Sequence, residues 1–420
     1  MEKSTAKQLI LEYQQLSSGI NLIPRTLHLS DGLNYVLVGL RRCGKSYILF
    51  QKMSELIAEG HSPEEMLYFN FEDERLGSLT LSDLDLIKTC YEELYPHRPI
   101  FFLDEVQNVE GWEHFARRIA DQGYTVYITG SNSKMLSREI AGVLGGRYMV
   151  QSVWPYSFGE YLSAEGVVLA ENWQLSPERS KVVRLYSNYF RYGGLPEVQK
   201  IEPKMRRPWL ENLYNKIFFG DILMRYAIRN TMGLKLLLRK LAESVKQPSS
   251  YSRLAGIVSS AGSKTRVDTV MDYVSYAEES CIIFGIENYA AKIVEKSSTR
   301  KYYYADNGLL SLFLFDPETS LLENIVAIRL KSLYDDLTYY HNGTEVDFFL
   351  WEHGIAIQAC WSISNPDTLK RETDGLLSIS ERLGVKNLVI VTNDESGALT
   401  LSNGLPVRVV PAYQWLLEEM

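Results

Sequence analysis

The stretch GLRRCGKS at residues 39–46 decides the fold predicted for the first part of this chain. Its spacing is Gly-x-x-x-x-Gly-Lys-Ser, and it lies between the apolar segments YVLV at 35–38 and YILF at 47–50. A strand, a glycine-rich loop and a helix in this order are typical of a phosphate-binding loop, because glycine lets the backbone turn tightly and point N–H groups at phosphate oxygens. The alternative is a strand-to-helix turn without a ligand.

Two side chains at the end of this loop predict what binds there. A lysine in this position reaches the β- and γ-phosphates of a nucleotide, and the following hydroxyl holds Mg²⁺. Lys45 and Ser46 have these places in the pattern. We therefore expect ATP and Mg²⁺ as cofactors. The residues expected to contact the nucleotide are Gly39, Leu40, Arg41, Arg42, Cys43, Gly44, Lys45, Ser46 and Tyr47.

A second motif, IFFLDE at residues 100–105, places two carboxylates after four apolar residues. Such a run predicts a buried parallel strand, and ligands of open α/β sheets bind at the carboxyl ends of the strands. Asp104 is then predicted to be the second magnesium residue, and Glu105 to orient and deprotonate an attacking water. The alternative is that the acidic pair only caps a helix.

Polar residues after the next predicted strand are further candidates. Ser131 and Asn132 follow the strand at 125–129 and could sense the γ-phosphate or the water, or they could be turn and capping residues. Arg147 follows Gly145-Gly146 and could stabilise transition-state charge in its own subunit or in a neighbour's. A surface salt bridge is the competing explanation for this arginine.

Length and composition limit the protein class. A chain of 420 residues with 45% hydrophobic and 23% charged residues is too long for one ordinary core and too apolar for general disorder. The first residues lack the pattern of a secretory signal, and no run of eighteen apolar residues occurs. The four cysteines form no metal-binding pair. We expect a cytoplasmic protein with no membrane span.

Charge is distributed unevenly along the chain. The net charge is −8, yet residues 201–270 hold thirteen Lys and Arg against five Asp and Glu. A basic module on an acidic enzyme has this distribution, and so does a solvated helical surface.

Five stretches together resemble the AAA-related, archaeal-type P-loop ATPases of bacteria and archaea over roughly residues 20–165. They are GLRRCGKS, YFNFEDERL, FFLDEVQNVEGWEHFARRI, YITGSNSKMLSREIAGVLGGRY and VWPYSFGEYL. The resemblance implies ATP hydrolysis with Mg²⁺. It assigns nucleotide and magnesium roles to Lys45, Ser46, Asp104 and Glu105, a Gly-Ser-Asn step to residues 130–132, and a Gly-Arg step to residues 146–147. The element at 158–162 marks the end of the ATPase core.

The whole chain is predicted to be α/β, with a P-loop NTPase parallel sheet followed by a helical and winged-helix module and a small α/β nuclease-like domain. The expected boundaries are 1–165 for the ATPase domain, 166–232 for a helical connector or lid, 233–305 for the winged helix, and 306–420 for the last domain. Lys264 and Arg266 start the third helix of the winged helix, where a DNA-reading helix contacts bases and phosphates. Such domains also serve as protein-interaction modules.

The last domain resembles the restriction-endonuclease-like domain that accompanies this ATPase family. The active form of that fold holds a metal ion with an Asp and a Glu or Gln, and places a Lys two residues after the latter. Asp347 and Gln358 match, Glu323 lies on a predicted helix, and Cys360 stands where the lysine is expected. A thiol cannot supply an ammonium charge, so the nuclease centre is predicted to be inactive.

The sequence thus predicts Mg²⁺-dependent ATP binding and hydrolysis coupled to movement of C-terminal modules that bind DNA or an unidentified protein. One alternative is a nucleotide-gated switch with little turnover, and another is a metal-dependent nuclease. The predicted ATPase function is also compatible with an oligomer.

Overall fold

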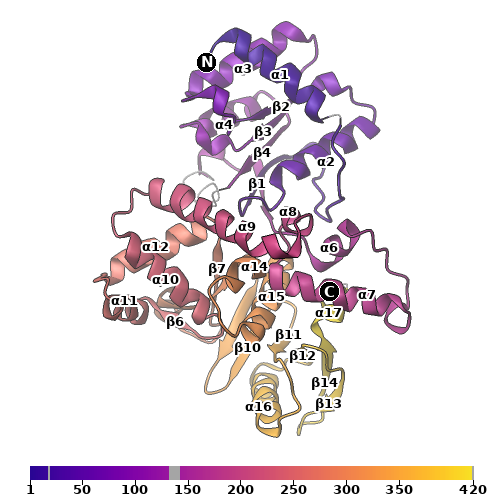
Figure 1. Ribbon diagram of the computed structural model, residues 1–420, viewed down its shortest axis with the longest axis vertical. Coiled ribbons are helices and arrows are strands. Elements are labelled where there is room, and N and C mark those ends of the chain that lie inside the picture. The colour runs from indigo at the N-terminus through magenta and orange to yellow at the C-terminus, as the bar shows by residue number, and fades with distance from the viewer. Residues whose placement is uncertain (18, 132–141, 419–420) are drawn as a thin grey trace. The chain divides into compact units, whose positions relative to one another are not determined.

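The computed structural model describes residues 1–17, 19–131 and 142–418, and the chain forms two compact units (Figure 1). The first contains residues 1–154 and 279–281, and the second contains residues 155–278 and 282–420. Among the described residues, no helix is both long and apolar enough to cross a membrane.

The first unit is built on a five-stranded sheet in which every pair is parallel. In spatial order its strands are β2 (Met66–Asn70), β3 (Ile100–Asp104), β4 (Val126–Gly130), β1 (Asn34–Gly39) and β5 (Tyr148–Val153). The strands are almost entirely buried apart from β5, as expected for a parallel sheet that helices cover. Because all strands run the same way, the loops after β1, β3 and β4 meet at one edge.

One helix precedes the first strand of this sheet, and other helices connect the strands. They are α1 (Lys3–Ser17), α2 (Lys45–Ala58), α3 (Leu81–Leu94) and α4 (Trp112–Asp121), with the short turns η1 (Pro63–Glu65), η2 (Glu74–Leu76) and η3 (Val106–Asn108). The helix α3 begins with a capping box in which Thr80 and Asp83 satisfy each other's backbone N–H groups. The helix α1 packs against α3 and β2, so the opening segment is part of this unit.

The second unit begins with helices. They are α6 (Phe158–Ala164), η5 (Trp173–Leu175), α7 (Glu178–Tyr192), α8 (Pro196–Gln199), α9 (Pro203–Lys216), the π-helix η6 (Ile217–Met224), α10 (Thr231–Glu243), α11 (Tyr251–Ser260) and α12 (Val267–Glu279). The helix α6 belongs to this unit because Phe158 and Tyr161 pack on the rings of Tyr186 and Tyr189 of α7.

Two sheets complete the second unit. The three-stranded sheet has the order β6 (Ser249–Ser250), β8 (Thr299–Tyr304), β7 (Ile283–Glu287), with α13 (Ile293–Ser298) before β8. The six-stranded sheet has the order β13 (Gly397–Thr400), β14 (Pro406–Pro411), β12 (Asn387–Thr392), β11 (Ile355–Ala359), β10 (Glu345–Leu350), β9 (Leu337–His341). Its helices are α14 (Asn307–Ser311), α15 (Glu318–Leu333), α16 (Pro366–Leu383) and α17 (Ala412–Trp415). The α/β class, the parallel sheet and the following helical region with further sheets are confirmed.

Candidate functional site

The loop between β1 and α2 has the local geometry that its glycines predict. Gly44 caps α2 with φ 103°, a left-handed conformation that favours glycine. Gly39 ends β1 where the neighbouring strand is very close: a Cβ on this residue would lie 2.1 Å from the carbonyl oxygen of Val153. Both glycines are therefore required by the backbone, independently of any ligand.

Lys45 turns back over this loop. Its Nζ donates to the carbonyl oxygens of Gly39 at 3.1 Å and Leu40 at 3.3 Å, and lies 3.3 Å from Glu105 Oε1. The lysine side chain is only 4% exposed. Burial favours the neutral amine and is the largest single effect, but Glu105 and the other acidic groups nearby together outweigh it and raise the pKa of Lys45. A permanently charged ammonium therefore lies within the loop.

Asp104 is the last residue of β3, and hydroxyl groups of neighbouring side chains contact its carboxylate. Tyr68 donates to Oδ2 at 2.7 Å, and Thr129 donates to Oδ1. Burial and the neighbouring Glu105 raise the pKa of Asp104, while hydrogen bonds from Thr129, Tyr68 and Ser46 act in the opposite direction. Ser46 and Asp104, the two residues predicted to hold a metal ion, are thus close enough to interact.

Glu105 follows in a left-handed conformation with φ 56°, which is uncommon for a residue other than glycine and clusters at functional sites. Its N–H donates to Thr129 Oγ1 at 2.9 Å. Its Oε2 accepts from Gln107 Nε2 at 2.5 Å and from the Ser131 N–H at 3.2 Å. Burial alone would raise the pKa of Glu105, but Lys45 and these donors lower it below the ordinary value, so the carboxylate is ionised at neutral pH.

The structure thus brings Lys45, Ser46, Asp104, Glu105 and Ser131 together at the carboxyl edge of the parallel sheet. Other loop residues flank them. Leu40 and Cys43 are buried, Arg41 pairs with Glu72 at 2.6 Å, and Arg42 and Tyr47 are exposed. Asn132 lies outside the described residues.

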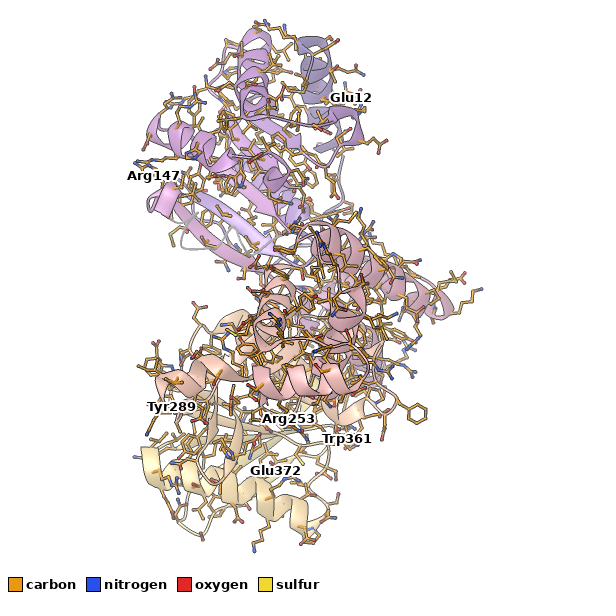
Figure 2. All side chains as sticks on the ribbon, turned by 90° about the vertical axis from the view of Figure 1, so that its left-hand side faces the viewer. Glu12, Arg147, Arg253, Tyr289, Trp361 and Glu372 are labelled. Carbon is orange, nitrogen blue, oxygen red and sulfur yellow. The ribbon has the colours of Figure 1, made fainter. Side chains whose placement is uncertain are left out.

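Arg147 is not part of this site. It directly precedes β5, and its carbonyl oxygen accepts from Asn34 Nδ2 at 3.2 Å, at the start of β1. Since β1 and β5 are parallel, Arg147 lies at the edge of the sheet opposite to the phosphate-binding loop (Figure 2). Its guanidinium forms an ion pair with Asp121. Within this chain, Arg147 is therefore not among the residues gathered at the phosphate-binding loop.

Four residues at the site were not predicted from the sequence, and one of them is Gln107, which donates to Glu105. Tyr68 and Thr129 hold Asp104. Arg25 braces the loop by donating to the carbonyl oxygens of Cys43 at 3.1 Å and Trp154 at 2.7 Å. Thr129 lies near the end of the strand that Ser131 follows, and this position could have indicated a role at the site. Nothing in the sequence near Tyr68 or Arg25 indicates the contacts of these two residues.

Other predicted residues lie in the second unit. Lys264 and Arg266 are exposed in the turn before α12. Asp347 lies on β10 and Gln358 on β11, and the Asp347 N–H donates to Gln358 Oε1 at 2.9 Å. The Cys360 thiol donates to the Ser362 carbonyl oxygen at 3.2 Å, and burial raises its pKa to about 11. The thiol therefore remains neutral.

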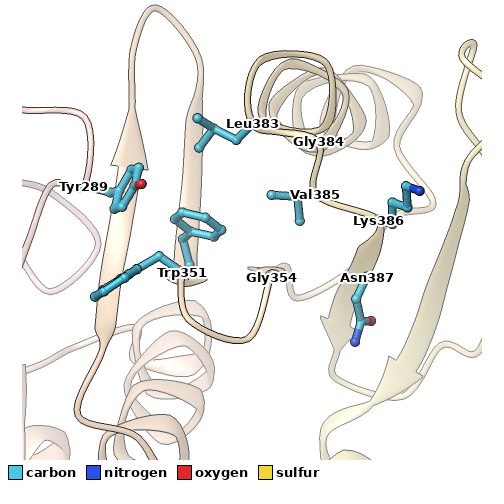
Figure 3. Close-up of a pocket in the computed structure, with 9 residues that line it drawn as sticks. Tyr289, Trp351, Gly354, Leu383, Gly384, Val385, Lys386 and Asn387 are labelled. Atoms are coloured by element: carbon cyan, nitrogen blue, oxygen red, sulfur yellow. The ribbon is translucent and has the colours of Figure 1, made fainter.

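One pocket of the second unit has a volume of about 410 Å³ (Figure 3). Its lining includes the rings of Tyr289, Phe349 and Trp351 on one side and Lys386 and Asn387 on the other. None of the residues predicted from the sequence to form a site lines this pocket.

The parallel sheet, the glycine loop and the acidic strand end define the first unit as a P-loop NTPase fold. Residues 33–162 match a family described as an AAA domain, and residues 183–319 match a domain of unknown function. The chain is 27% identical over 430 residues to an uncharacterized protein of Methanocaldococcus jannaschii. The alignment covers 99% of this chain and 96% of that protein.

Two further proteins are similar to this chain. An uncharacterized protein of Haemophilus influenzae is 28% identical over 393 residues, covering 91% of this chain and 94% of its own length. Among solved structures, the Walker-type ATPase of Pyrococcus abyssi is 16% identical with a TM-score of 0.39, covering 74% of this chain and 95% of that chain.

Proposed function

We propose that this protein binds ATP with Mg²⁺ at residues 39–46 and hydrolyses it. The observation that carries the proposal is the convergence of Lys45, Asp104 and Glu105 at one edge of the sheet, where parallel strands present their carboxyl ends to ligands. An ammonium, a carboxylate near a hydroxyl, and a second, ionised carboxylate are the groups that nucleotide hydrolysis requires.

The residues present fit a magnesium ion. Ser46 offers a hydroxyl and Asp104 a carboxylate, and Mg²⁺ prefers oxygen ligands of this kind while keeping waters and substrate phosphates in its shell. When bound, the ion supplies charge neutralisation at the phosphates. Tyr68 and Thr129 fix the orientation of the Asp104 carboxylate.

Glu105 is proposed to orient the attacking water and accept its proton. Its carboxylate is ionised, and it is held from two sides by Gln107 and the Ser131 N–H. Phosphate binding would require the Lys45 ammonium to leave Glu105 for the phosphate oxygens. The same exchange releases the Glu105 carboxylate, so nucleotide binding itself would prepare the base.

Phosphate release by the purified protein tests this proposal. We expect turnover in the presence of ATP and Mg²⁺, and a loss of turnover in both Lys45→Ala and Glu105→Gln. Turnover that survives in both variants would overturn the assignment.

The C-terminal segments are proposed to respond to this hydrolysis and to bind a partner. The proposed boundaries remain 166–232 for a connector, 233–305 for a winged helix and 306–420 for a nuclease-like domain. The helices α10, α11 and α12 and the strands β7 and β8 follow one another in the order of a winged helix. A partner of this module would be either DNA or a protein.

Charges on the third helix of this module favour a protein. The solvent-facing side of α12 carries Asp268, Met271 and Asp272. Two carboxylates on the helix that would enter the DNA major groove oppose the phosphate backbone. Salt-dependent DNA binding that weakens when Lys264 and Arg266 become alanine would instead support the DNA alternative.

A switch with slow turnover is the second candidate, supported by the direct pairing of Lys45 with Glu105. Co-purification from the native cell with Glu105→Gln would identify the partner, because a variant that binds ATP without hydrolysing it should retain the partner. For Arg147, action on the nucleotide of a neighbouring subunit remains a proposal. It predicts an oligomer whose ATP turnover falls in Arg147→Ala.

A further inference from the structure

A lysine that the ATPase proposal does not use is completely buried in the second unit. Lys301 lies on β8 with a side chain that is 0% exposed. Its Nζ lies 2.7 Å from Glu345 Oε1, 3.0 Å from Asp347 Oδ1 and 3.2 Å from Glu323 Oε1. Two of these contacts, to Glu323 and Asp347, are hydrogen bonds, and the contact with Glu345 is an ion pair.

The lysine and the carboxylates come from different parts of the chain. Lys301 belongs to the three-stranded sheet, whereas Glu323 is on α15, and Glu345 and Asp347 are on β10 of the six-stranded sheet. Tyr303, two residues further along β8 and hence on the same face, donates to Glu323 Oε1 at 2.8 Å. One face of β8 thus contacts the carboxylates of the next segment. We call these four charged residues the Lys301 centre.

Backbone contacts support the same connection. The Tyr289 N–H donates to the Tyr339 carbonyl oxygen at 2.8 Å, and Asn288 Nδ2 donates to the His341 carbonyl oxygen at 3.0 Å. These bonds join the end of β7 to β9. The three-stranded and six-stranded sheets are therefore held together by a main-chain hydrogen bond, by the Asn288 side chain and by the Lys301 centre.

The oxygen atoms that a metal ion would use are already occupied. Lys301 takes Oδ1 of Asp347, and the Ala359 N–H donates to Oδ2 at 3.1 Å. Gln358 Oε1 accepts the Asp347 N–H, and its Nε2 donates to the Glu345 carbonyl oxygen at 3.0 Å. Asp347 and Gln358 are the two residues that match the metal ligands of the nuclease-like fold.

Charge balance gives the same result. The carboxyl groups of Glu323, Glu345 and Asp347 all lie within 3.2 Å of the Lys301 Nζ. Glu323 is 4% exposed, whereas the side chains of Asp347 and Glu345 are 15% and 36% exposed, so the ammonium is the buried partner of all three carboxyl groups. A divalent ion beside Lys301 would meet a like charge at close range in a low-dielectric interior.

We propose that the Lys301 ammonium is the built-in cation of this centre: it takes the place of a divalent metal ion and ties β8 to the C-terminal sheet. The Lys301 centre then connects the two sheets without a metal ion. As a consequence, the winged-helix-like segment and the nuclease-like segment move as one body, and the proposed nucleotide-driven change acts on both together.

Mn²⁺ binding to the nucleotide-free full chain tests this assignment, with the ion followed by electron paramagnetic resonance. The wild type and Asp347→Asn should bind Mn²⁺ equally, because the native centre takes up none. Lys301→Met removes the cation while keeping the length of the side chain, and should gain one Mn²⁺ site. That new site should disappear in the double variant Lys301→Met/Asp347→Asn. Lys246→Met, at an exposed lysine of the same unit, is the matched control.

Thermal unfolding provides an independent readout. Lys301→Met should melt at a lower temperature than the wild type and recover several degrees when Mn²⁺ is added, whereas the wild type should be unaffected by EDTA or Mn²⁺. A Mn²⁺ site in the wild type that Asp347→Asn removes would overturn the proposal, and so would a folded Lys301→Met that gains no site. If Lys301→Met does not fold, the comparison of the wild type with Asp347→Asn decides the question alone.

Discussion

Glu105→Gln separates two roles of one carboxylate, namely pairing with Lys45 and the proposed activation of water. The Nζ of Lys45 lies 3.3 Å from Glu105 Oε1. With an effective dielectric constant of about 20, Coulomb's law gives a gross attraction of about 5 kcal/mol for this pair. The net contribution is much smaller, since hydrogen bonds to charged groups typically contribute about 1.5–3 kcal/mol to stability.

Nucleotide binding has to break this pair, so its removal should make binding tighter. Taking the lower end of that range, we expect the Kd for ATP to fall about tenfold in Glu105→Gln, since a factor of ten corresponds to about 1.4 kcal/mol. Turnover should change in the opposite direction. Loss of a general base lowers the rate by about 10²–10⁴.

The assay combines titration with a fluorescent ATP analogue and single-turnover phosphate release. Glu110→Gln is the matched control, because Glu110 is an exposed glutamate close to Glu105 in the chain, and both measurements should stay unchanged. Weaker ATP binding in Glu105→Gln would refute the competition between Lys45 pairing and nucleotide binding. Turnover retained at the wild-type rate would refute the role of Glu105 as the base.

Two further predictions concern stability. Gly39→Ala places a Cβ 2.1 Å from the Val153 carbonyl oxygen and should cost about 1–3 kcal/mol or more in urea unfolding, whereas Gly256→Ala, in open space on α11, should gain up to about 1 kcal/mol. Equal effects would contradict the close approach of β1 and β5. Between pH 4.5, the ordinary pKa, and about 8, Glu323 holds a proton that the unfolded chain has released. Stability should therefore fall with rising pH by at most about 1.4 kcal/mol per unit from this group. Glu323→Gln should flatten this dependence in urea unfolding at several pH values, and an unchanged slope would contradict the raised pKa.

The phosphate-binding loop and the acidic strand end could be predicted because their geometry is local. A glycine loop between a strand and a helix positions Lys45 and Ser46 through the backbone of eight consecutive residues. The same holds for Asp104 and Glu105, which need only the end of one strand. The class of the first unit follows from these two motifs, and the parallel sheet confirms it.

Residues that act across strands could not be predicted in this way. Tyr68 is part of an apolar run on β2, and only the pairing of β2 with β3 brings its hydroxyl to Asp104. Arg147 illustrates the opposite situation. Its place after two glycines resembles an arginine that acts on phosphate, but the direction of β5 places it at the other edge of the sheet.

The role of Lys301 could not be predicted from sequence spacing, because its ammonium reaches Asp347 from a strand of a different sheet. The sequence directs attention to position 360, where a cysteine replaces the expected lysine, and hence to an uncompensated Asp347. The lysine on β8 is 46 residues from Asp347, and the three tyrosines that follow it predict an ordinary buried strand. Yet Glu323 is buried and Asp347 is only 15% exposed, and an unpaired buried charge is strongly destabilising. Such an acidic cluster requires a nearby cation, and the chain provides the Lys301 ammonium from the preceding sheet.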